Sequence, residues 1–457
     1  MSTEATTLTA SEITTRSRCA GVVGAGGGGF PLHAKPSRRP DSPTVDTVIA
    51  NGAECEPLLH KDAELMAHHA AQIVEGLQLA MAAVGAHHGI LGLKSKHIAA
   101  IAAFGPLLPG TGIDLHELGD FYPTGDEYIL VYETTGRLIP SAGLPLDVGC
   151  IVSNVESLYN LAAASRGNPV IRKMAAVAGA VAQPFTGWVP IGVDLAWLIE
   201  QAGGATSEDV AYYVGGVMMG KLEHDSSLPV TKTTAGVIVL PGDHHLVQRA
   251  ETPVAAKHRI GKSACDQCSY CTELCPRYLL GHDLEPHKVM RGLLFSLEGE
   301  DTWNHWGTLC CECGLCTLLA CPEDLFPREA CQQAKADLLP QGRGRLGPRE
   351  TPVPIQPHPM YESRHTPLKQ LVQRLGLTPF DTPSPLRDPD AIPAQFVLPL
   401  KQHAGAPAVP CVTVGQRVQQ GALIADVGET ALGAPLHAPA AGTVRAIDDT
   451  QIVLASC

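Results

Sequence analysis

The sequence lacks the features of a membrane-spanning, a secreted or a nucleic-acid-binding protein. No stretch contains the roughly 18 consecutive apolar residues that a spanning helix needs, and the nearest approach, residues 99–108, ends at Pro109. Residues 1–19 have no basic segment followed by an apolar one, so we expect no secretory signal. Acidic residues outnumber lysine and arginine by 46 to 33, and a net charge of −13 disfavours nucleic acid and anionic membranes as partners. We therefore expect a cytoplasmic protein without a membrane span.

Aromatic residues are also scarce, at 5%, whereas glycine (46) and proline (37) are abundant, which is typical of a loop-rich chain. A length of 457 residues suggests about three domains. Fifteen cysteines would indicate disulfides in a secreted chain, but thiols stay reduced in the cytoplasm. We therefore expect the cysteines to bind metal clusters.

Eight cysteines between positions 265 and 321 fall into two groups of closely matching spacing. The first reads C-x2-C-x2-C-x3-C-P and the second C-x2-C-x2-C-x4-C-P. This is the spacing of bacterial two-cluster ferredoxins, in which each run gives three thiolates to one [4Fe–4S] cluster and its fourth cysteine to the other. The predicted ligands are Cys265, Cys268, Cys271 and Cys321 for the first cluster, and Cys310, Cys313, Cys316 and Cys275 for the second.

A pair of zinc ribbons is the alternative, because paired C-x2-C motifs are also typical of zinc sites. Zinc sites rarely add a third cysteine at the same spacing followed by Cys-Pro, so the pattern favours iron–sulfur clusters. Cys311 lies beside the second group, but its spacing to Cys313 fits poorly, and we leave it out. A protein with two such clusters transfers single electrons.

Helices and strands are predicted to alternate after a flexible N-terminal segment. Strands are expected at residues 47–50, 89–93 and 128–132, and a long helix at 67–86. This alternation predicts an α/β domain that binds ligands at its loop ends.

A compact α+β unit is predicted next, from paired strands at residues 175–181 and 187–190, a helix at 195–202 and a strand at 212–217. After the cysteines, a proline-dense segment with one helical island at residues 367–375 predicts a linker or wrapping arm. Short apolar runs between glycine and proline turns predict a small all-β tail.

A glycine-rich run, Gly24-Ala-Gly-Gly-Gly-Gly-Phe30-Pro, opens the α/β region. Glycine backbones let a phosphate or a flat ring approach closely, and their N–H groups can form an anion-binding nest. Lys35, five residues after Phe30, could pair with a phosphate. Three polar loops follow, at residues 51–57 (NGAECEP), 122–127 (YPTGDE) and 153–156 (SNVE).

These four motifs, in this order, resemble the flavin-carrying, NADH-binding subunit of respiratory complex I. The resemblance implies that FMN binds at the glycine loop and receives a hydride from NADH. The implied cofactor-binding residues are Gly24, Gly26, Phe30, Lys35, Asn51, Glu54, Glu56, Tyr122, Gly125, Asp126, Glu127, Ser153 and Asn154, with Phe30 and Glu127 near the nicotinamide nucleotide. Ala25, Ala53 and Asp126 replace the Arg, Asp and Glu of that family.

The α+β unit resembles the soluble-ligand-binding β-grasp domain (SLBB). Together with the two-cluster unit, it resembles RnfC subunits of the Rnf complex and the PduS-type cobalamin reductases. Residues 398–444 resemble the barrel-sandwich domain that RnfC carries at its N-terminus, but here this domain follows the clusters, as in the cobalamin reductases. Similar lipoyl and biotinyl domains carry a modified lysine; no lysine follows Lys401, which excludes a swinging-arm role.

The predicted fold class is a multi-domain α/β and α+β chain. Its expected parts are a flexible segment (1–20), a Rossmann-like FMN- and NADH-binding α/β domain (21–165), a β-grasp domain (166–245), a helical two-[4Fe–4S] ferredoxin-like domain (253–340), a proline-rich linker (341–394) and a barrel-sandwich hybrid domain (395–457).

The resemblance implies a flavin and iron–sulfur oxidoreductase that passes electrons from NADH through FMN and two clusters to cobalamin. Implied partners are cobalamin, a corrinoid-handling enzyme such as an adenosyltransferase or a diol dehydratase, and the shell proteins of a bacterial microcompartment. Two alternatives stay open. One is an RnfC-like electron-entry subunit of a membrane ion-translocating complex, and the other is an electron-transfer adaptor without nucleotide binding.

Overall fold

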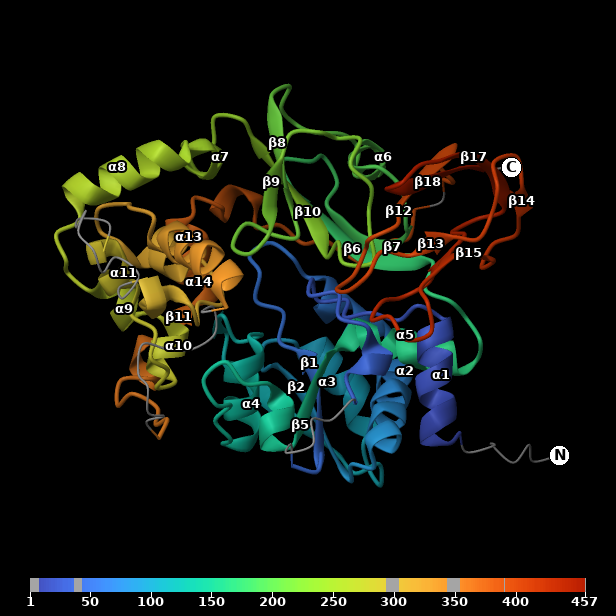
Figure 1. Ribbon diagram of the computed structural model, residues 1–457, viewed down its shortest axis with the longest axis horizontal. Coiled ribbons are helices and arrows are strands. Elements are labelled where there is room, and N and C mark those ends of the chain that lie inside the picture. Colours follow the sequence, from blue (N-terminus) through green and yellow to red (C-terminus); the bar gives the residue numbers. More distant parts are fainter. Residues whose placement is uncertain (1–7, 37–42, 293–303, 343–353, 390, 457) are drawn as a thin grey trace.

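Four parallel strands form the centre of the N-terminal third of the chain (Figure 1). The computed structural model describes residues 8–36, 43–292, 304–342, 354–389 and 391–456. In sheet order, the strands are β3 (Ile113–Leu118), β2 (His88–Lys94), β1 (Thr47–Gly52) and β5 (Cys150–Asn154). The predicted strands at residues 47–50 and 89–93 are confirmed. The central strand β1 is buried because helices cover both faces of a parallel sheet.

One face of this sheet is covered by α2 (Lys61–Val84) and α5 (Val155–Ser165), which pack closely against each other. Gly76 permits this approach, since a Cβ atom there would lie 1.9 Å from the Leu158 carbonyl oxygen. Val48 and Ala50 of β1 face this layer, whereas Ile49 points to the other face. Beyond β2, α3 (Ile98–Phe104) packs against α2.

The expectation of a flexible segment at residues 1–20 is wrong for residues 10–19. They form helix α1 (Ala10–Cys19), which packs against α2 and α5. A capping box begins the helix, because Thr9 and Glu12 each accept a hydrogen bond from the other's main-chain N–H. Ile13 is only 2% exposed, so the helix is held by a buried anchor as well as by its cap. Residues 1–7 lie outside the described part of the chain.

The predicted strand at residues 128–132 is also wrong, because this segment lies in helix α4 (Glu127–Thr135). Asp126 caps the helix by accepting hydrogen bonds from the N–H groups of Tyr128 and Ile129. Gly136 ends it in the left-handed conformation, at φ 71°. The helix covers the second face of the parallel sheet. Its cap and its glycine outweigh the weak strand preference of the aromatic and branched residues between them.

A mixed five-stranded sheet follows, with β6 and β10 paired in parallel at its centre. In sheet order, its strands are β7 (Phe185–Pro190), β6 (Arg172–Gly179), β10 (Gly236–Pro241), β8 (Val210–Val214) and β9 (Lys221–Glu223). The predicted pairing of the first two strands is confirmed. Helix α6 (Leu195–Gln201) begins at Asp194, whose side chain accepts from the Trp197 N–H, and two glycines follow it as predicted.

Short helices carry the cysteine groups, at the left of Figure 1. They are α7 (His245–Glu251), α8 (Val254–Ala264), α9 (Tyr270–Glu273), α10 (Pro276–Leu279), α11 (Pro286–Gly292), the single turn η5 (Cys316–Ala320) and α13 (Pro327–Leu338). Helices α11 and α13 pack together through Val289, Ala330 and Ala334.

The proline-dense segment wraps back over the earlier units. Strand β11 (Thr366–Pro367) pairs with β4 (Phe121–Tyr122) beside the flavin domain, and α14 (Leu368–Arg374) occupies the predicted helical island. Further on, the Arg387 N–H donates to the Thr186 carbonyl oxygen. The described part of the segment therefore behaves as a wrapping arm, the second of the two forms that its composition predicts.

Two small antiparallel sheets form the C-terminal unit, as predicted. One sheet contains, in order, β12 (Gln395–Pro399), β18 (Gln451–Ser456), β17 (Gly442–Ile447) and β14 (Arg417–Val418); the other contains β13 (Val409–Pro410), β15 (Leu423–Asp426) and β16 (Leu436–His437). Phe396 and Leu398 of β12 share a buried core with Val189 and Ile191 of the mixed sheet, so the unit is docked against it (Figure 1).

Candidate functional site

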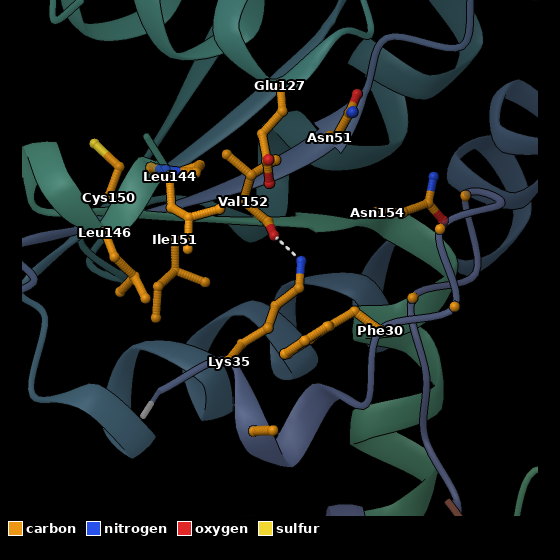
Figure 2. A pocket seen from close by; sticks show the side chains of 16 residues that line it. Phe30, Lys35, Asn51, Glu127, Leu144, Leu146, Cys150, Ile151, Val152 and Asn154 are labelled. Carbon is orange, nitrogen blue, oxygen red and sulfur yellow. Dashed lines mark hydrogen bonds between the residues drawn. The ribbon is translucent and has the colours of Figure 1, made fainter. Parts of the chain in front are cut away.

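A cavity of about 490 Å³ lies where the glycine loop meets strands β1 and β5 (Figure 2). Seven predicted cofactor-binding residues line it, namely Gly24, Gly26, Phe30, Lys35, Asn51, Glu127 and Asn154. Sequence reasoning missed the rest of the lining, namely Gly28, Gly29, Ala34, Leu144, Pro145, Leu146, Cys150, Ile151 and Val152. The two glycines belong to the glycine-rich run itself, but the apolar residues carry no distinguishing signal.

The glycine loop is a tight turn closed by main-chain hydrogen bonds. The Gly24 N–H donates to the Phe30 carbonyl oxygen (2.9 Å), and the Gly29 N–H donates to the Gly24 carbonyl oxygen (3.0 Å). Gly27, at φ 104°, requires glycine because side chains rarely adopt this conformation. A Cβ atom on Gly28 would meet no protein atom within 4 Å, so this part of the loop faces open space in the cavity.

Lys35 extends from the loop that follows and crosses the cavity floor (Figure 2). Its ammonium group donates to the Val152 carbonyl oxygen, and among the described residues no carboxylate lies within ion-pairing distance of it. Burial lowers the pKa of Lys35, and the nearby charge of Glu127 opposes that shift. Burial raises the pKa of Glu127 in turn. The cavity thus contains a cation without a fixed anionic partner.

Buried charges support the loop from below. Lys173, on β6 of the mixed sheet, donates to the Ala25 carbonyl oxygen (2.8 Å) and forms an ion pair with Glu156. Lys61 lies 3.3 Å from the same Glu156 carboxylate, and all three side chains are at most 2% exposed. Because an unpaired buried charge is costly, these contacts hold the loop and the first turn of α5 in one arrangement.

Asn154 is oriented by the same network. Its amide donates to Asp62 (2.8 Å), which also forms an ion pair with Lys61. Its side-chain oxygen accepts from the Glu156 N–H and so caps α5. On the neighbouring strand, the Asn51 amide donates to the Gly125 carbonyl oxygen (2.9 Å). Both asparagine side chains are therefore fixed before any ligand binds.

The other six predicted cofactor-binding residues do not line the cavity. Gly125 contacts Asn51 through its carbonyl oxygen, and Ser153 faces a small separate cavity behind Lys35. Glu54 accepts from the Asp62 N–H, and burial raises its pKa to about 8. These assignments stay predictions, as do those of Glu56, Tyr122 and Asp126.

Tyr122 and Asp126 connect the flavin domain to the cysteine-bearing helices. The Tyr122 hydroxyl donates to the Cys313 carbonyl oxygen (2.7 Å), and Tyr122 is 2% exposed. Asp126 forms an ion pair (2.9 Å) with Arg277, which follows Cys275 by two residues. Glu56 contacts the mixed sheet instead, because its carboxyl group accepts from the Met218 N–H. The loops at residues 51–57 and 122–127 therefore join three units of the fold.

The cluster cysteines are free thiols whose side chains influence one another. Burial raises the pKa of Cys271 to about 12, and charges on Cys321, Cys265 and Cys268 raise it further. Burial also raises the pKa of Cys316, and charges on Cys310, Cys271 and Cys275 add to that effect. Among the described residues, no three Cys, His, Asp or Glu side chains converge closely enough to bind a single metal ion. The thiols are spread more widely than the ligands of one ion.

Both predicted cofactor sites pass a test of chemical fit. The flavin cavity offers an open glycine loop, a lysine without an anionic partner and two oriented amides, which suits a phosphorylated flat ring. The two thiol sets consist only of cysteine, the ligand of [4Fe–4S] clusters. Bringing buried thiolates together is unfavourable unless positive iron compensates their charge.

Comparison with protein families identifies three parts of the chain. The Nuo51 FMN-binding domain matches residues 17–163, the 4Fe-4S dicluster domain matches residues 264–326, and the RnfC barrel sandwich hybrid domain matches residues 384–457. The chain therefore has an FMN-binding domain and a [4Fe–4S] dicluster domain, as predicted, and its tail is the barrel-sandwich domain.

Two curated relatives span almost the whole chain. Cobalamin reductase PduS of Salmonella typhimurium is 42% identical over 449 residues, which cover 98% of this chain and 97% of the relative. Cobalamin reductase PduS of Citrobacter freundii is 41% identical over 99% of this chain and 98% of the relative. The chain belongs to the PduS cobalamin reductase family.

Membership of the PduS family agrees with the order of the domains, since the match to PduS continues through the C-terminal barrel-sandwich unit. Similarity to the Rnf type is shorter. The RnfC-type component of the Na(+)-translocating ferredoxin:NAD(+) oxidoreductase complex of Acetobacterium woodii is 36% identical over 263 residues, which cover 57% of this chain and 56% of that relative. In the part of the chain that the structure describes, no helix is long and apolar enough to cross a membrane.

Proposed function

We propose that this protein is an NADH-dependent cobalamin reductase, in which electrons pass through FMN and two [4Fe–4S] clusters to the cobalt of a corrinoid. Bound FMN would accept a hydride and release its electrons singly, and the clusters would carry them onward. The observation that carries the proposal is the extent of the match to PduS, which runs through 98% of the chain and includes every domain.

The chain's own residues would bind and orient the flavin. Lys35 would neutralise the flavin phosphate, and the N–H groups of the glycine loop would surround it. Asn51 and Asn154 would hold the ring, since both amides already lie at the cavity edge in fixed orientations. Phe30, which is 36% exposed, and Glu127 would contact the nicotinamide nucleotide at the cavity mouth.

The remaining predicted residues would act around this centre. Glu54, Gly125 and Ser153 would shape the flavin loops from behind. Glu56, Tyr122 and Asp126 would hold the flavin domain against its neighbours, as their contacts with Met218, Cys313 and Arg277 support.

We propose that each cluster receives its fourth ligand from the other cysteine run. Cys321 would complete the set that contains Cys271, and Cys275 would complete the set that contains Cys316. The mutual effects of these thiols on their pKa values support this partition. The domain boundaries stand as predicted, and the mixed sheet of residues 166–245 would be a β-grasp domain of the soluble-ligand-binding type, with α6 packed on its two central parallel strands.

The electrons would serve a corrinoid-handling partner such as an adenosyltransferase or a diol dehydratase, within a bacterial microcompartment. The decisive assay uses the anaerobically purified protein with its flavin and iron content measured. We expect NADH to bleach the flavin and to drive reduction of cob(III)alamin. Bleached flavin and reduced clusters without cobalamin turnover would contradict the acceptor, and unbleached flavin would favour the adaptor alternative. Co-purification with integral membrane subunits would favour the RnfC-like alternative.

A further inference from the structure

A second cavity, of about 290 Å³, lies between the flavin domain and the second cysteine group. Cys310 and Cys311 form part of its wall, and Tyr128 and Gly143 contribute from the flavin domain. It shares no lining residue with the flavin cavity. It therefore offers a separate route by which a molecule could approach the second cluster.

Two buried polar atoms at this cavity have no hydrogen-bond partner among the described residues. Arg277 is 8% exposed, and while its Nη2 atom pairs with Asp126, its Nη1 atom is unpaired. His282 is 3% exposed; its Nδ1 atom lies 3.3 Å from the Ser141 hydroxyl, and its Nε2 atom is unpaired. Buried polar groups are nearly always bonded, so two unpaired groups at one cavity indicate a missing ligand with hydrogen-bonding atoms.

The two groups are held rigidly. The Arg277 guanidinium stacks 3.5 Å from the Tyr128 ring centre, and the ring centres of Tyr128 and His282 lie 5.2 Å apart. The Tyr128 hydroxyl donates to the Gly143 carbonyl oxygen (2.6 Å), which fixes the ring between them. Burial, and then the charge of Arg277, lower the pKa of His282 to about 3, so its imidazole is neutral and has one donor and one acceptor nitrogen.

A primary amide matches this pair of groups. Its carbonyl oxygen can accept from Arg277 Nη1, and its oxygen and NH₂ group suit His282 Nε2 in either tautomer. A carboxylate would suit only the tautomer that carries the proton on Nε2. The edge of a cobalamin ring bears several primary amides, whereas a flavin or a nicotinamide ring offers a single carboxamide at most.

We propose that this cavity docks the electron acceptor of the second cluster by an amide-bearing edge, with Arg277 and His282 as its hydrogen-bonding partners. The inference rests on the proposed function, in which the acceptor is a corrinoid. One electron would leave the reduced cluster and convert Co(III) to Co(II), so the cluster is oxidised as the cobalt is reduced. No bond to the protein forms or breaks in this step.

The test compares two cavity variants with a control in the holoprotein. His282→Ala removes one hydrogen-bonding partner, and Ala142→Trp fills the cavity from a different wall residue. His437→Ala is the control, because this histidine also has an unpaired ring nitrogen but lies on β16 of the C-terminal unit. Equilibrium dialysis of aquacobalamin with the oxidised holoprotein measures binding directly. NADH-driven cobalamin reduction is measured in parallel and divided by the ferricyanide reductase rate of the same preparation.

We expect both cavity variants to bind aquacobalamin at least about tenfold more weakly, the equivalent of about 1.4 kcal/mol, and the control to match the wild type. Cobyrinic acid, whose ring edge bears carboxylates in place of amides, should bind the wild type more weakly than aquacobalamin. Unchanged binding and normalised turnover in both cavity variants would overturn the docking site and leave the proposed function intact. Failure of the wild type itself to bind and reduce cobalamin would overturn both. Tighter binding of cobyrinic acid would overturn the amide assignment.

Discussion

Tyr122 donates a hydrogen bond from its hydroxyl group to the main-chain carbonyl oxygen of Cys313, over 2.7 Å. The hydroxyl belongs to a loop of the flavin domain, and the carbonyl to the loop that carries predicted ligands of the second cluster. Tyr122 is 2% exposed, so water has little access to replace the bond. The two loops are therefore held at a fixed separation by a contact that involves neither cofactor.

Tyr122→Phe should loosen this junction. The Cys313 carbonyl oxygen would lose its partner while buried, which costs about 1–3 kcal/mol. We expect a lower thermal midpoint and, in anaerobic stopped-flow experiments with NADH, slower reduction of the clusters relative to reduction of the flavin.

Tyr213→Phe is a matched control for this prediction. Its hydroxyl also donates to a main-chain carbonyl oxygen, that of Leu246, over 2.8 Å, and Tyr213 is 5% exposed. We expect a similar fall in the midpoint without a change in the ratio of the two rates. An equal change of that ratio in both variants would reduce the role of Tyr122 to general stability.

Iron analysis of double variants can establish the exchange of the fourth ligands. Cys268→Ser combined with Cys321→Ser removes two ligands of one predicted cluster, so the protein should retain about four iron atoms. Cys268→Ser combined with Cys275→Ser removes one ligand from each cluster, and both should be lost or weakened. Cys411→Ser, an exposed cysteine of the C-terminal unit, should retain the full iron content. The reverse result for the two doubles would show that each run binds its own cluster with all four cysteines.

Local sequence patterns predicted the parts of the site that depend on neighbouring residues. Cysteine spacing indicated the dicluster domain because three ligands of each cluster come from one short run. The glycine loop and the two asparagine loops indicated the flavin cavity because parallel strands end at a common edge. The same local reasoning failed at residues 128–132, where Asp126 and Gly136 determine a helix from outside the predicted strand.

Contacts across long stretches of chain had no such signal. Lys173 reaches the Ala25 carbonyl oxygen from 148 residues away, and no motif at β6 distinguishes it from an ordinary surface lysine. The cavity beside Cys310 likewise combines Tyr128, Arg277 and His282 from separate units. Such sites follow from how the domains pack, which the spacing of residues within one segment does not encode.

Lys35→Met should weaken FMN binding. A charge-assisted contact contributes about 1.5–3 kcal/mol, so we expect the dissociation constant to rise about tenfold or more in a flavin-fluorescence titration of the deflavinated protein. Burial lowers the pKa of Lys35 in the free protein, so the wild type should bind FMN more weakly as the pH rises through that lowered pKa. The variant should lack this alkaline dependence. Lys257→Met, a lysine of helix α8, is the control; an effect there of the same size would contradict a specific role for Lys35.

Glu56→Gln should change how stability depends on pH. Burial raises the pKa of Glu56 to about 8, from an ordinary value of 4.5. The folded wild type therefore holds a proton that the unfolded chain releases between these values, and its stability falls as the pH rises toward 8, by about 1 kcal/mol per pH unit within that window. Glutamine can still accept from the Met218 N–H and does not ionise. We expect equal thermal midpoints at pH 5 and a midpoint several degrees higher for the variant at pH 8, on a scale of about 2–4 °C per kcal/mol. Glu251→Gln, at a half-exposed glutamate, should show no such divergence. Parallel pH profiles for Glu56→Gln and the wild type would mean that Glu56 is ionised in the folded protein.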